Sequence, residues 1–422
     1  MFGGLKVYFD SLLNSKEIRN KVFFTLFALV IFRLLATVPV VGIPAEALRE
    51  LFSQNSFFDI VSTVSGGVLE TASLVAVGLS PYINASIIFQ LLSSVIPKLK
   101  ELRKEGSQGQ KTINMYTRFL TLPLAIAQSF VIYSTLRGFG LIDELAPLEL
   151  AAMSATLTGG AMIMMWLGEL VTEKGISNGI SFLIFVGIVA MVPSSILQNF
   201  EYMDMVEKAI IIAIFVIIFA VVIIVNEAER RIKTLYSRRS RNGMAMENYL
   251  PIKLAQFGVL PVIFAVSLLS FPQLIAQFLA TRDISDQVTA YANKMLELLA
   301  NPYIENIGIF VFVIAFSFFY ITVVFNTDDL AENLQKQGAF IPGIRPGKST
   351  SAYLKKISYR LTALGSVFLG LLAVLPNLLV YSGIVQTAIV SGTALLIAVS
   401  VALEMKRKYE SMMVVRSYDK YL

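Results

Sequence analysis

Apolar runs long enough to cross a lipid bilayer recur along the whole chain. We place ten of them, near residues 22–40, 74–96, 113–136, 148–170, 177–198, 208–226, 253–271, 303–325, 359–376 and 381–403. A spanning helix needs about 20 mostly apolar residues. Hydrophobic residues make up 56% of the 422, against 15% charged. The sequence therefore predicts an all-α polytopic membrane protein with ten transmembrane helices.

The distribution of positive charge predicts how these helices are oriented. With ten spans, most Lys and Arg fall on one side, in the N-terminus, 98–111, 230–253, 336–360 and the tail from Lys406. Positive loops stay in the cytoplasm, so both termini are expected there. The net charge of +6 is then mostly a matter of topology, and DNA binding is not expected.

Ten spans divide into two sets of five, which predicts two halves, residues 1–200 and 201–422. An odd number of spans inserts the second half upside down relative to the first. Inverted repeats of this kind form a pathway at the interface between them. The second half also carries two large cytoplasmic loops, about 228–252 and 327–357.

A polar segment, Phe57–Ser73, precedes the second span. Its sequence, FFDIVSTVSGGVLETAS, is too short and too polar to cross a bilayer. Such backbone is tolerated at membrane depth only inside protein or beside a water-filled cavity. It predicts a re-entrant half-helix with a hinge at Gly66–Gly67, followed by a span from about Leu74. An ordinary extracellular loop is the alternative.

Ionisable groups are scarce inside the spans. The chain has no histidine and no cysteine. Glu169, Glu227 and Glu404 lie at cytoplasmic ends of spans, and Arg118 lies close enough to an end to snorkel. Arg33 is the deepest charge. Ion-coupled transporters keep a carboxylate or similar group deep in the bundle, so this pattern argues against an ion-driven pump. We expect no catalytic residue, metal site or cofactor.

Uncharged polar residues interrupt the second and third spans instead. They are Asn84, Ser86, Gln90, Thr121 and Gln128. Two explanations remain open, hydrogen bonds between helices and the lining of a pathway. Ile180 and Ile184 share one helical face, which by itself indicates contact with lipid or core.

The stretch GIRPGKST, Gly343–Thr350, resembles a phosphate-binding loop but fails the spacing test. That motif needs a glycine five residues before Gly347, and Pro342 stands there. The loop is also too short for a nucleotide-binding domain, so an ATP site is excluded. Long basic loops can dock an acidic or RNA-containing partner, although a solvated loop explains the charge equally well.

Four segments resemble signature segments of the SecY family of protein-conducting channels. They are GLSPYINASIIFQLL, GISNGISFLIFVGIVA, GAFIPGIRPGKST and SGTALLIAVSVALE, in the family's order. The resemblance implies an hourglass pore between the two halves. It implies a ring of aliphatic side chains at Leu79, Ile83, Ile180, Ile184, Ile263 and Ile397. It also implies a plug formed by Phe57–Ser73, with Phe57, Phe58, Ile60, Val61, Val64, Gly66 and Gly67.

The same resemblance implies a lateral gate and a docking surface. The gate would lie between the second and third spans and the seventh and eighth, with Asn84, Gln90 and Thr121 on its elements. The docking surface for the SecA ATPase and the ribosome would include Lys233, Arg238, Arg239, Arg241, Arg345 and Lys348. SecE, SecG, signal peptides and nascent chains are the further partners implied.

The predicted function is therefore a passive protein channel of the bacterial inner membrane. It would pass unfolded secretory polypeptides across the membrane and release transmembrane segments sideways into lipid. The main alternative is a secondary solute transporter built from inverted repeats. A non-conducting membrane scaffold or insertase is a third.

Overall fold

The structure is a computed structural model that describes residues 15–40, 73–138, 140, 142–201, 204–239, 245–255, 258–280, 285–299, 301–381 and 392–419. The chain forms two compact units. The first comprises residues 1–202, 266–305 and 389–422, and the second comprises 203–265 and 306–388. Separated stretches of sequence contribute to both units, and two helices, α11 and α13, have residues in each.

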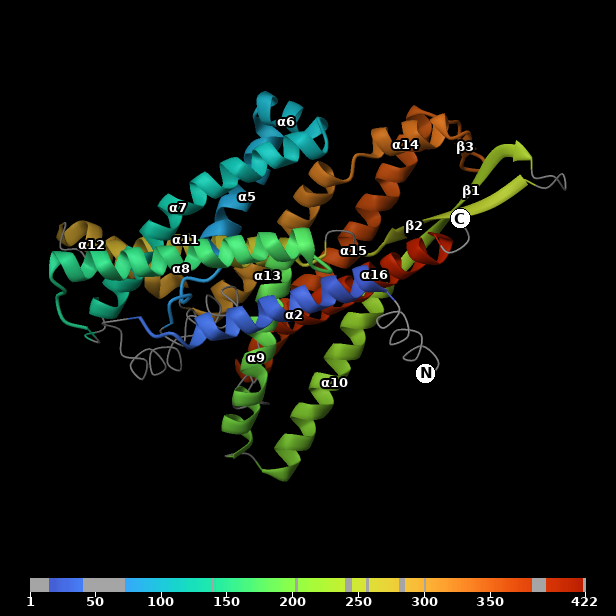
Figure 1. Cartoon of the computed structure of the whole chain (residues 1–422). Coiled ribbons are helices and arrows are strands. Elements are labelled where there is room, and N and C mark those ends of the chain that lie inside the picture. Colours follow the sequence, from blue (N-terminus) through green and yellow to red (C-terminus); the bar gives the residue numbers. More distant parts are fainter. Residues whose placement is uncertain are drawn as a thin grey trace. The chain divides into compact units, whose positions relative to one another are not determined.

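The first unit is helical. It contains α2 (Lys16–Thr37), α5 (Ser80–Val95), α6 (Pro97–Lys104), α7 (Ser107–Gly138), α8 (Pro147–Lys174), α9 (Gly179–Glu201), α12 (Asp286–Leu299), α16 (Gly392–Asp419) and most of α11 (Leu260–Ala280). Each of α5, α7, α8, α9 and α16 packs against the next in that order. Helix α2 packs against α8 and α9. Figure 1 shows these elements and their labels.

The second unit combines helices with a small sheet. It contains α10 (Met205–Glu227), β1 (Glu229–Arg239), β2 (Ala245–Lys253), α13 (Pro302–Val324, which begins in the first unit), α14 (Thr327–Lys336), β3 (Ala339–Phe340) and α15 (Lys348–Tyr381). The strands are antiparallel in the order β2-β1-β3. The hairpin of β1 and β2 is drawn as paired arrows in Figure 1.

Local signals in the sequence explain where several helices begin. Ser15 precedes α2, and its hydroxyl accepts a hydrogen bond from the Ile18 N–H at 3.3 Å. Asn326 caps α14 by accepting from the N–H groups of Asp328 and Asp329. Pro147 opens α8, where its missing N–H costs nothing. The caps at Ser15 and Asn326 satisfy N–H groups that have no partner within the helix.

Pro97 turns the chain sharply between α5 and α6. The two helices are bent by 104°. A proline disfavours helical backbone at the preceding residue, and Ile96 is accordingly extended, with φ −84° and ψ 118°. The second predicted span therefore ends at Val95, close to its predicted boundary.

Six described helices are each long and apolar enough to cross a membrane. They are α2, α7, α8, α10, α13 and α15. Helices α5 and α6 give a seventh candidate if taken together, while α9 and α11 hold shorter apolar stretches, Gly179–Pro193 and Leu260–Ser270. Each of the ten predicted spans overlaps a described helix, although residues 382–391 of the tenth lie outside the described residues. The protein is a multi-pass membrane protein, and the number of ten crossings stays a prediction.

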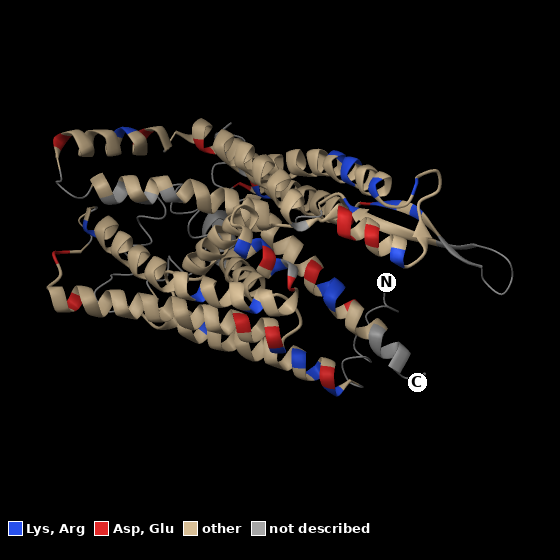
Figure 2. Ribbon diagram, turned by 90° about the horizontal axis from the view of Figure 1, so that it is seen from above, with Lys and Arg blue, Asp and Glu red and all other residues tan. Residues whose placement is uncertain are grey.

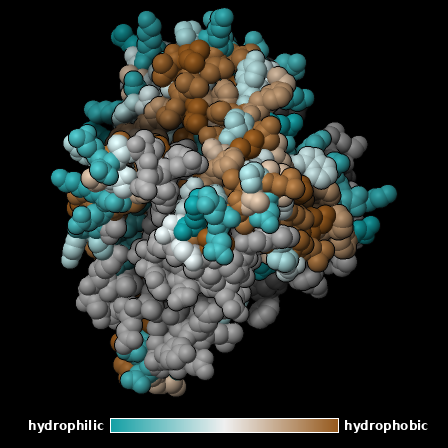
Figure 3. Space-filling model, turned by 90° about the vertical axis from the view of Figure 1, so that its left-hand side faces the viewer, coloured by the Kyte–Doolittle hydropathy of each residue, from teal (hydrophilic) through white to brown (hydrophobic). Residues whose placement is uncertain are grey.

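Exposed apolar side chains indicate contact with lipid. Helix α10 exposes Ile210, Ile212, Phe215, Val216, Ile217, Phe219, Val221 and Ile224. Water-soluble surfaces rarely present apolar patches of this extent. In Figure 2 the charged residues lie mainly toward helix ends and long middle sections are uncharged. Figure 3 shows one face of the molecule with apolar side chains open at the surface.

The prediction of an all-α chain is wrong for the first of the two large predicted loops. Residues 229–239 and 245–253 pair as antiparallel strands instead. Along β1, Ile232 and Thr234 are buried whereas Arg231 and Lys233 are exposed. This alternation of buried and exposed residues is the period of a strand with one covered face. The division of the chain into halves at about residue 200 stays a prediction.

Candidate functional site

The residues before and within the first turn of α5 are tightly held. The Leu74 N–H donates to the Val38 carbonyl at 2.8 Å, and Ser73 forms an isolated bridge with Pro39. The Ile83 N–H donates to the Leu79 carbonyl at 2.9 Å, which continues the helical pattern. Leu79 and Ile83 are buried, at 1% and 6% exposure. Two of the predicted ring residues thus lie one turn apart on a fixed segment.

Helices α9 and α16 carry three further ring candidates. Asn178 caps α9, and its Oδ1 accepts from the N–H groups of Ile180 (3.1 Å) and Ser181 (3.4 Å). Ile180 is half-buried and Ile184 is buried one turn later. Ile397 of α16 is also buried, and α16 packs against α9. The structure therefore places these three residues on neighbouring helices.

The sixth ring candidate, Ile263, lies in the second unit. It is buried in the first turn of α11. A single ring of six residues stays a prediction. The plug residues Phe57, Phe58, Ile60, Val61, Val64, Gly66 and Gly67 lie outside the described residues.

The predicted gate residues lie on α5 and α7, which pack against each other. Gln90 donates to Ser86 within α5 at 3.5 Å, and the Thr121 hydroxyl donates back to the Thr117 carbonyl at 2.7 Å. Asn84 is 4% exposed, and its Oδ1 makes no hydrogen bond with the described part of the chain. Of these three residues, only Asn84 has a buried polar atom left unsatisfied, which normally costs stability.

Other polar residues of these spans do bond between helices. Gln128 of α7 donates to the Ser80 hydroxyl of α5 at 3.3 Å. The hydroxyls of Ser129 (α7) and Ser154 (α8) are 2.7 Å apart and share a hydrogen bond. Interhelical bonding, one of the two explanations left open by the sequence, therefore applies to Gln128.

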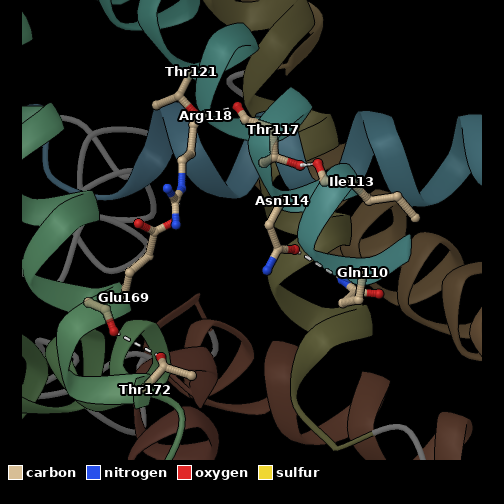
Figure 4. A network of polar contacts seen from close by, with 9 residues as sticks. Gln110, Ile113, Asn114, Thr117, Arg118, Thr121, Glu169 and Thr172 are labelled. Atoms are coloured by element: carbon tan, nitrogen blue, oxygen red, sulfur yellow. Dashed lines mark hydrogen bonds and ion pairs between the residues drawn. The ribbon is translucent and has the colours of Figure 1, made fainter. Parts of the chain in front are cut away.

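An ion pair joins α7 to α8. The Arg118 Nε lies 2.6 Å from Glu169 Oε1, with the side chains 52% and 19% exposed. Figure 4 shows the two side chains meeting across the helices, with Thr172 one turn beyond. Sequence reasoning placed each residue near a span end but did not pair them. The available signal was that both residues lie near the ends of their spans on the same predicted side of the membrane.

The two loops predicted to be cytoplasmic form one packed platform in the second unit. Its core cluster contains Ile232 and Ile252 of the hairpin, Leu334 of α14, Ala339 and Ile341 around β3, and Leu354 and Ile357 of α15. Leu354 is fully buried. The sequence predicted two separate loops, whereas the structure buries apolar residues of both in one cluster.

The loop before α15 presents two predicted docking residues. Arg345 and Lys348 are exposed. The Thr350 hydroxyl donates to the Arg345 carbonyl at 2.9 Å, and Ile344 packs against the platform core. Gly343 and Gly347 have φ of 79° and 92°, a region that other residues adopt with strain. The exposed cations therefore stand on a well-supported loop.

Hydrogen bonds tie α14 to the start of α15. The Ser351 hydroxyl lies 2.5 Å from Asp328 Oδ1 and 3.2 Å from Thr327 Oγ1. Nearby, the hydrogen bond from Lys336 to Glu332 raises the pKa of that lysine. In the hairpin, Lys233 is exposed. Arg238 and Arg239 end β1, and Arg241 lies outside the described residues.

Comparisons with known proteins give one consistent result. The SecY family model matches residues 73–406. The chain is 37% identical over 432 residues to the protein translocase subunit SecY of Bacillus subtilis (strain 168), covering 98% of each chain. It is 37% identical over 441 residues to the same subunit of Mycobacterium tuberculosis (strain ATCC 25618 / H37Rv), covering 98% of this chain and 99% of that one.

Solved structures agree at the level of the fold. A structure described as that of a protein conducting channel superposes with a TM-score of 0.71 and 19% identity, covering 95% of this chain and 94% of that one. Sec61 in the canine ribosome-channel complex superposes with a TM-score of 0.66 and 18% identity, with the same coverage.

Proposed function

Because the chain belongs to the SecY family, we propose that it is the channel through which unfolded polypeptides cross a bacterial inner membrane. The observation that carries this proposal is the match to SecY translocase subunits over 98% of the chain. The proposed channel is passive. Its driving force comes from the SecA ATPase or from ribosomal synthesis, in keeping with spans that carry charge mainly at their ends.

The proposed pore closes on aliphatic side chains. A ring formed by Leu79, Ile83, Ile180, Ile184, Ile263 and Ile397 would close around an extended chain and exclude ions by dewetting. Support comes from the burial of all of these except Ile180, which is half-buried. The plug at 57–73 would seal the same pore from outside.

The proposed lateral gate lies between α5 and α7 on one side and α11 and α13 on the other. A signal sequence or transmembrane segment would leave by this route, because apolar helices partition into lipid. Support comes from the polar residues of α5 and α7. The buried Asn84 Oδ1 in particular, which has no hydrogen bond to the described residues, could accept one from a passing chain.

The proposed docking surface is the cytoplasmic platform. Lys233, Arg238, Arg239, Arg241, Arg345 and Lys348 would bind SecA or ribosomal RNA through their positive charge. The Sec61 and Ssh1 structures similar to this chain are described as ribosome complexes, which supports the ribosome as a partner. SecE and SecG would complete the complex, with both termini of the chain in the cytoplasm.

Cross-linking tests the pore directly, since the chain has no cysteine of its own. A single cysteine replaces Ile83, and a secretory chain carrying one cysteine is stalled in transit and oxidised. The control is Phe27→Cys, at a side chain 61% exposed in the middle of α2. We expect disulfides at position 83 well above the level at 27. Equal yields at both positions would rule out the pore assignment.

A further inference from the structure

Helix α8 approaches the segment before α5 at a glycine. A Cβ added at Gly160 would lie 1.8 Å from the Leu74 carbonyl oxygen, far inside ordinary contact. The neighbouring Gly159 has open space, with nothing within 4 Å of an added Cβ. Leu74 lies five residues before Leu79. The absence of a side chain at Gly160 thus decides where the Leu79 segment runs.

The same helix approaches the start of α9 at a second glycine. A Cβ at Gly168 would lie 3.0 Å from Ile180 Cγ1. From the other side, a Cβ at Gly179 would lie 2.0 Å from the Gly168 carbonyl oxygen. Residues 168 and 179 therefore meet backbone to backbone, directly beside the side chain of Ile180.

A threonine closes this second contact. The Thr172 hydroxyl donates to the Gly168 carbonyl at 2.8 Å and accepts from the Gly179 N–H at 2.8 Å. One hydroxyl thus satisfies the N–H of the first residue of α9 and links the two helices. Threonine is common inside membrane helices for local bonding alone, but this one also bridges to another helix.

We infer that Gly160, Gly168, Thr172 and Gly179 are positioning residues for the pore ring. They hold Leu79 and Ile180, on two different segments, against one rigid helix. A closed aliphatic ring excludes ions only while its diameter stays small. A shift of about an ångström in either segment should therefore let ions leak through the resting channel. This inference rests on the proposed function, because it takes Leu79 and Ile180 as ring residues.

A glycine pair on α8 supplies a matched test. The full chain is expressed with its partner subunits, and ion leakage through the resting channel is measured in membrane vesicles. Gly160→Ala must displace the Leu74 carbonyl by more than an ångström, and we expect a several-fold higher leak. Gly159→Ala makes the same change in open space and should leak like the unaltered chain. Equal leakage from both variants would overturn the inference.

The threonine supplies a second test that does not depend on overpacking. Thr172→Val keeps the shape and removes the hydroxyl, whereas Thr172→Ser keeps the hydroxyl. We expect increased leakage for valine and rescue by serine. Thermal unfolding of each variant is measured in parallel, because a purely structural role would lower stability without changing the leak. That result, or the same leakage from valine and serine, contradicts a positioning role.

Ring variants separate failure of the inference from failure of the pore assignment. Ile83→Gly and Ile180→Gly remove ring side chains directly and should leak strongly. If they leak ions while Gly160→Ala and Thr172→Val do not, the assignment of the ring is supported and the positioning role is wrong. If neither ring variant leaks, the ring itself is wrong.

Discussion

At the scale of single residues, Arg345 gives the sharpest prediction. Its side chain is exposed and its carbonyl is held by Thr350, so Arg345→Glu should reverse a charge without disturbing the fold. We expect SecA-driven export to be lost, because a docking cation becomes an anion facing an acidic partner surface. The measurement is uptake of a secretory precursor by membrane vesicles, alongside the amount of channel in the membrane.

Lys294→Glu is the control for that charge reversal. Lys294 is an exposed cation on α12, in a segment predicted to face the outside. The Lys294→Glu variant should export the precursor normally and accumulate in the membrane to the same level as the unaltered channel. Normal export by Arg345→Glu would remove Arg345 from the docking surface.

The Arg118–Glu169 pair gives a second prediction at this scale. Arg118→Glu places two carboxylates together and should destabilise the protein, while the swap Arg118→Glu with Glu169→Arg should restore most of the loss. Pairs this exposed are worth about 0.5–1 kcal/mol in double-mutant cycles. Unfolding free energies of the purified variants check this.

A second ion pair in the same unit serves as the comparison. Arg137 and Glu144 lie 3.1 Å apart and are 48% and 73% exposed. Because Glu144 is much more exposed than Glu169, its pair should show the smaller coupling. A larger coupling at Arg137–Glu144 would mean that the lower exposure of Glu169 does not strengthen its ion pair.

At the scale of elements, the platform core predicts a link between packing and docking. Leu354→Ala removes a fully buried side chain from the cluster that joins the hairpin to α15. Such changes cost about 2–5 kcal/mol. We expect the platform to become sensitive to protease and export to fall, with the membrane helices intact. Leu364→Ala, at a position 67% exposed on the same helix, should change neither; an equal loss of export would refute the link.

Sequence reasoning found the helices more readily than the sheet. Spans are conspicuous because a bilayer demands long apolar runs. In β1 the signal is the alternation of Ile232 and Thr234 with Arg231 and Lys233, but a stretch so rich in positive charge is equally typical of a solvated loop. The two-residue strand β3 pairs with Leu235 and Tyr236, about a hundred residues away, and no local pattern could predict that.

The sequence predicted which residues belong to the candidate site, but it did not predict which of them contact one another. Asn84, Gln90 and Thr121 lie on α5 and α7, which pack together, while their role in a gate stays a prediction. The bond between Ser80 and Gln128, and the close approach of Gly160 to Leu74, depend on how distant segments fold against one another. A single sequence carries little information about such pairs, so the positioning contacts of α8 emerged only from the structure.

At the scale of the whole molecule, the last prediction concerns the number of times the chain crosses the membrane. Six described helices qualify alone, α5 qualifies only together with α6, and α9 and α11 hold shorter apolar stretches. The sequence predicts ten crossings with a cytoplasmic N-terminus. In that arrangement Ser107 and Asn333 face the cytoplasm, while Asp143 and Lys294 face outward. All four side chains are exposed, so each position can report its side.

Single cysteines at these four positions test the topology in the cysteine-free chain. We expect a membrane-impermeant maleimide to label positions 143 and 294 in intact cells, and positions 107 and 333 only in inverted vesicles. Labelling of position 107 from outside would mean that α5 does not cross the membrane. Labelling of position 294 from inside would mean that an odd number of the helices before it do not cross. Either result would break the five-and-five arrangement, because each half must cross an odd number of times to be inverted relative to the other.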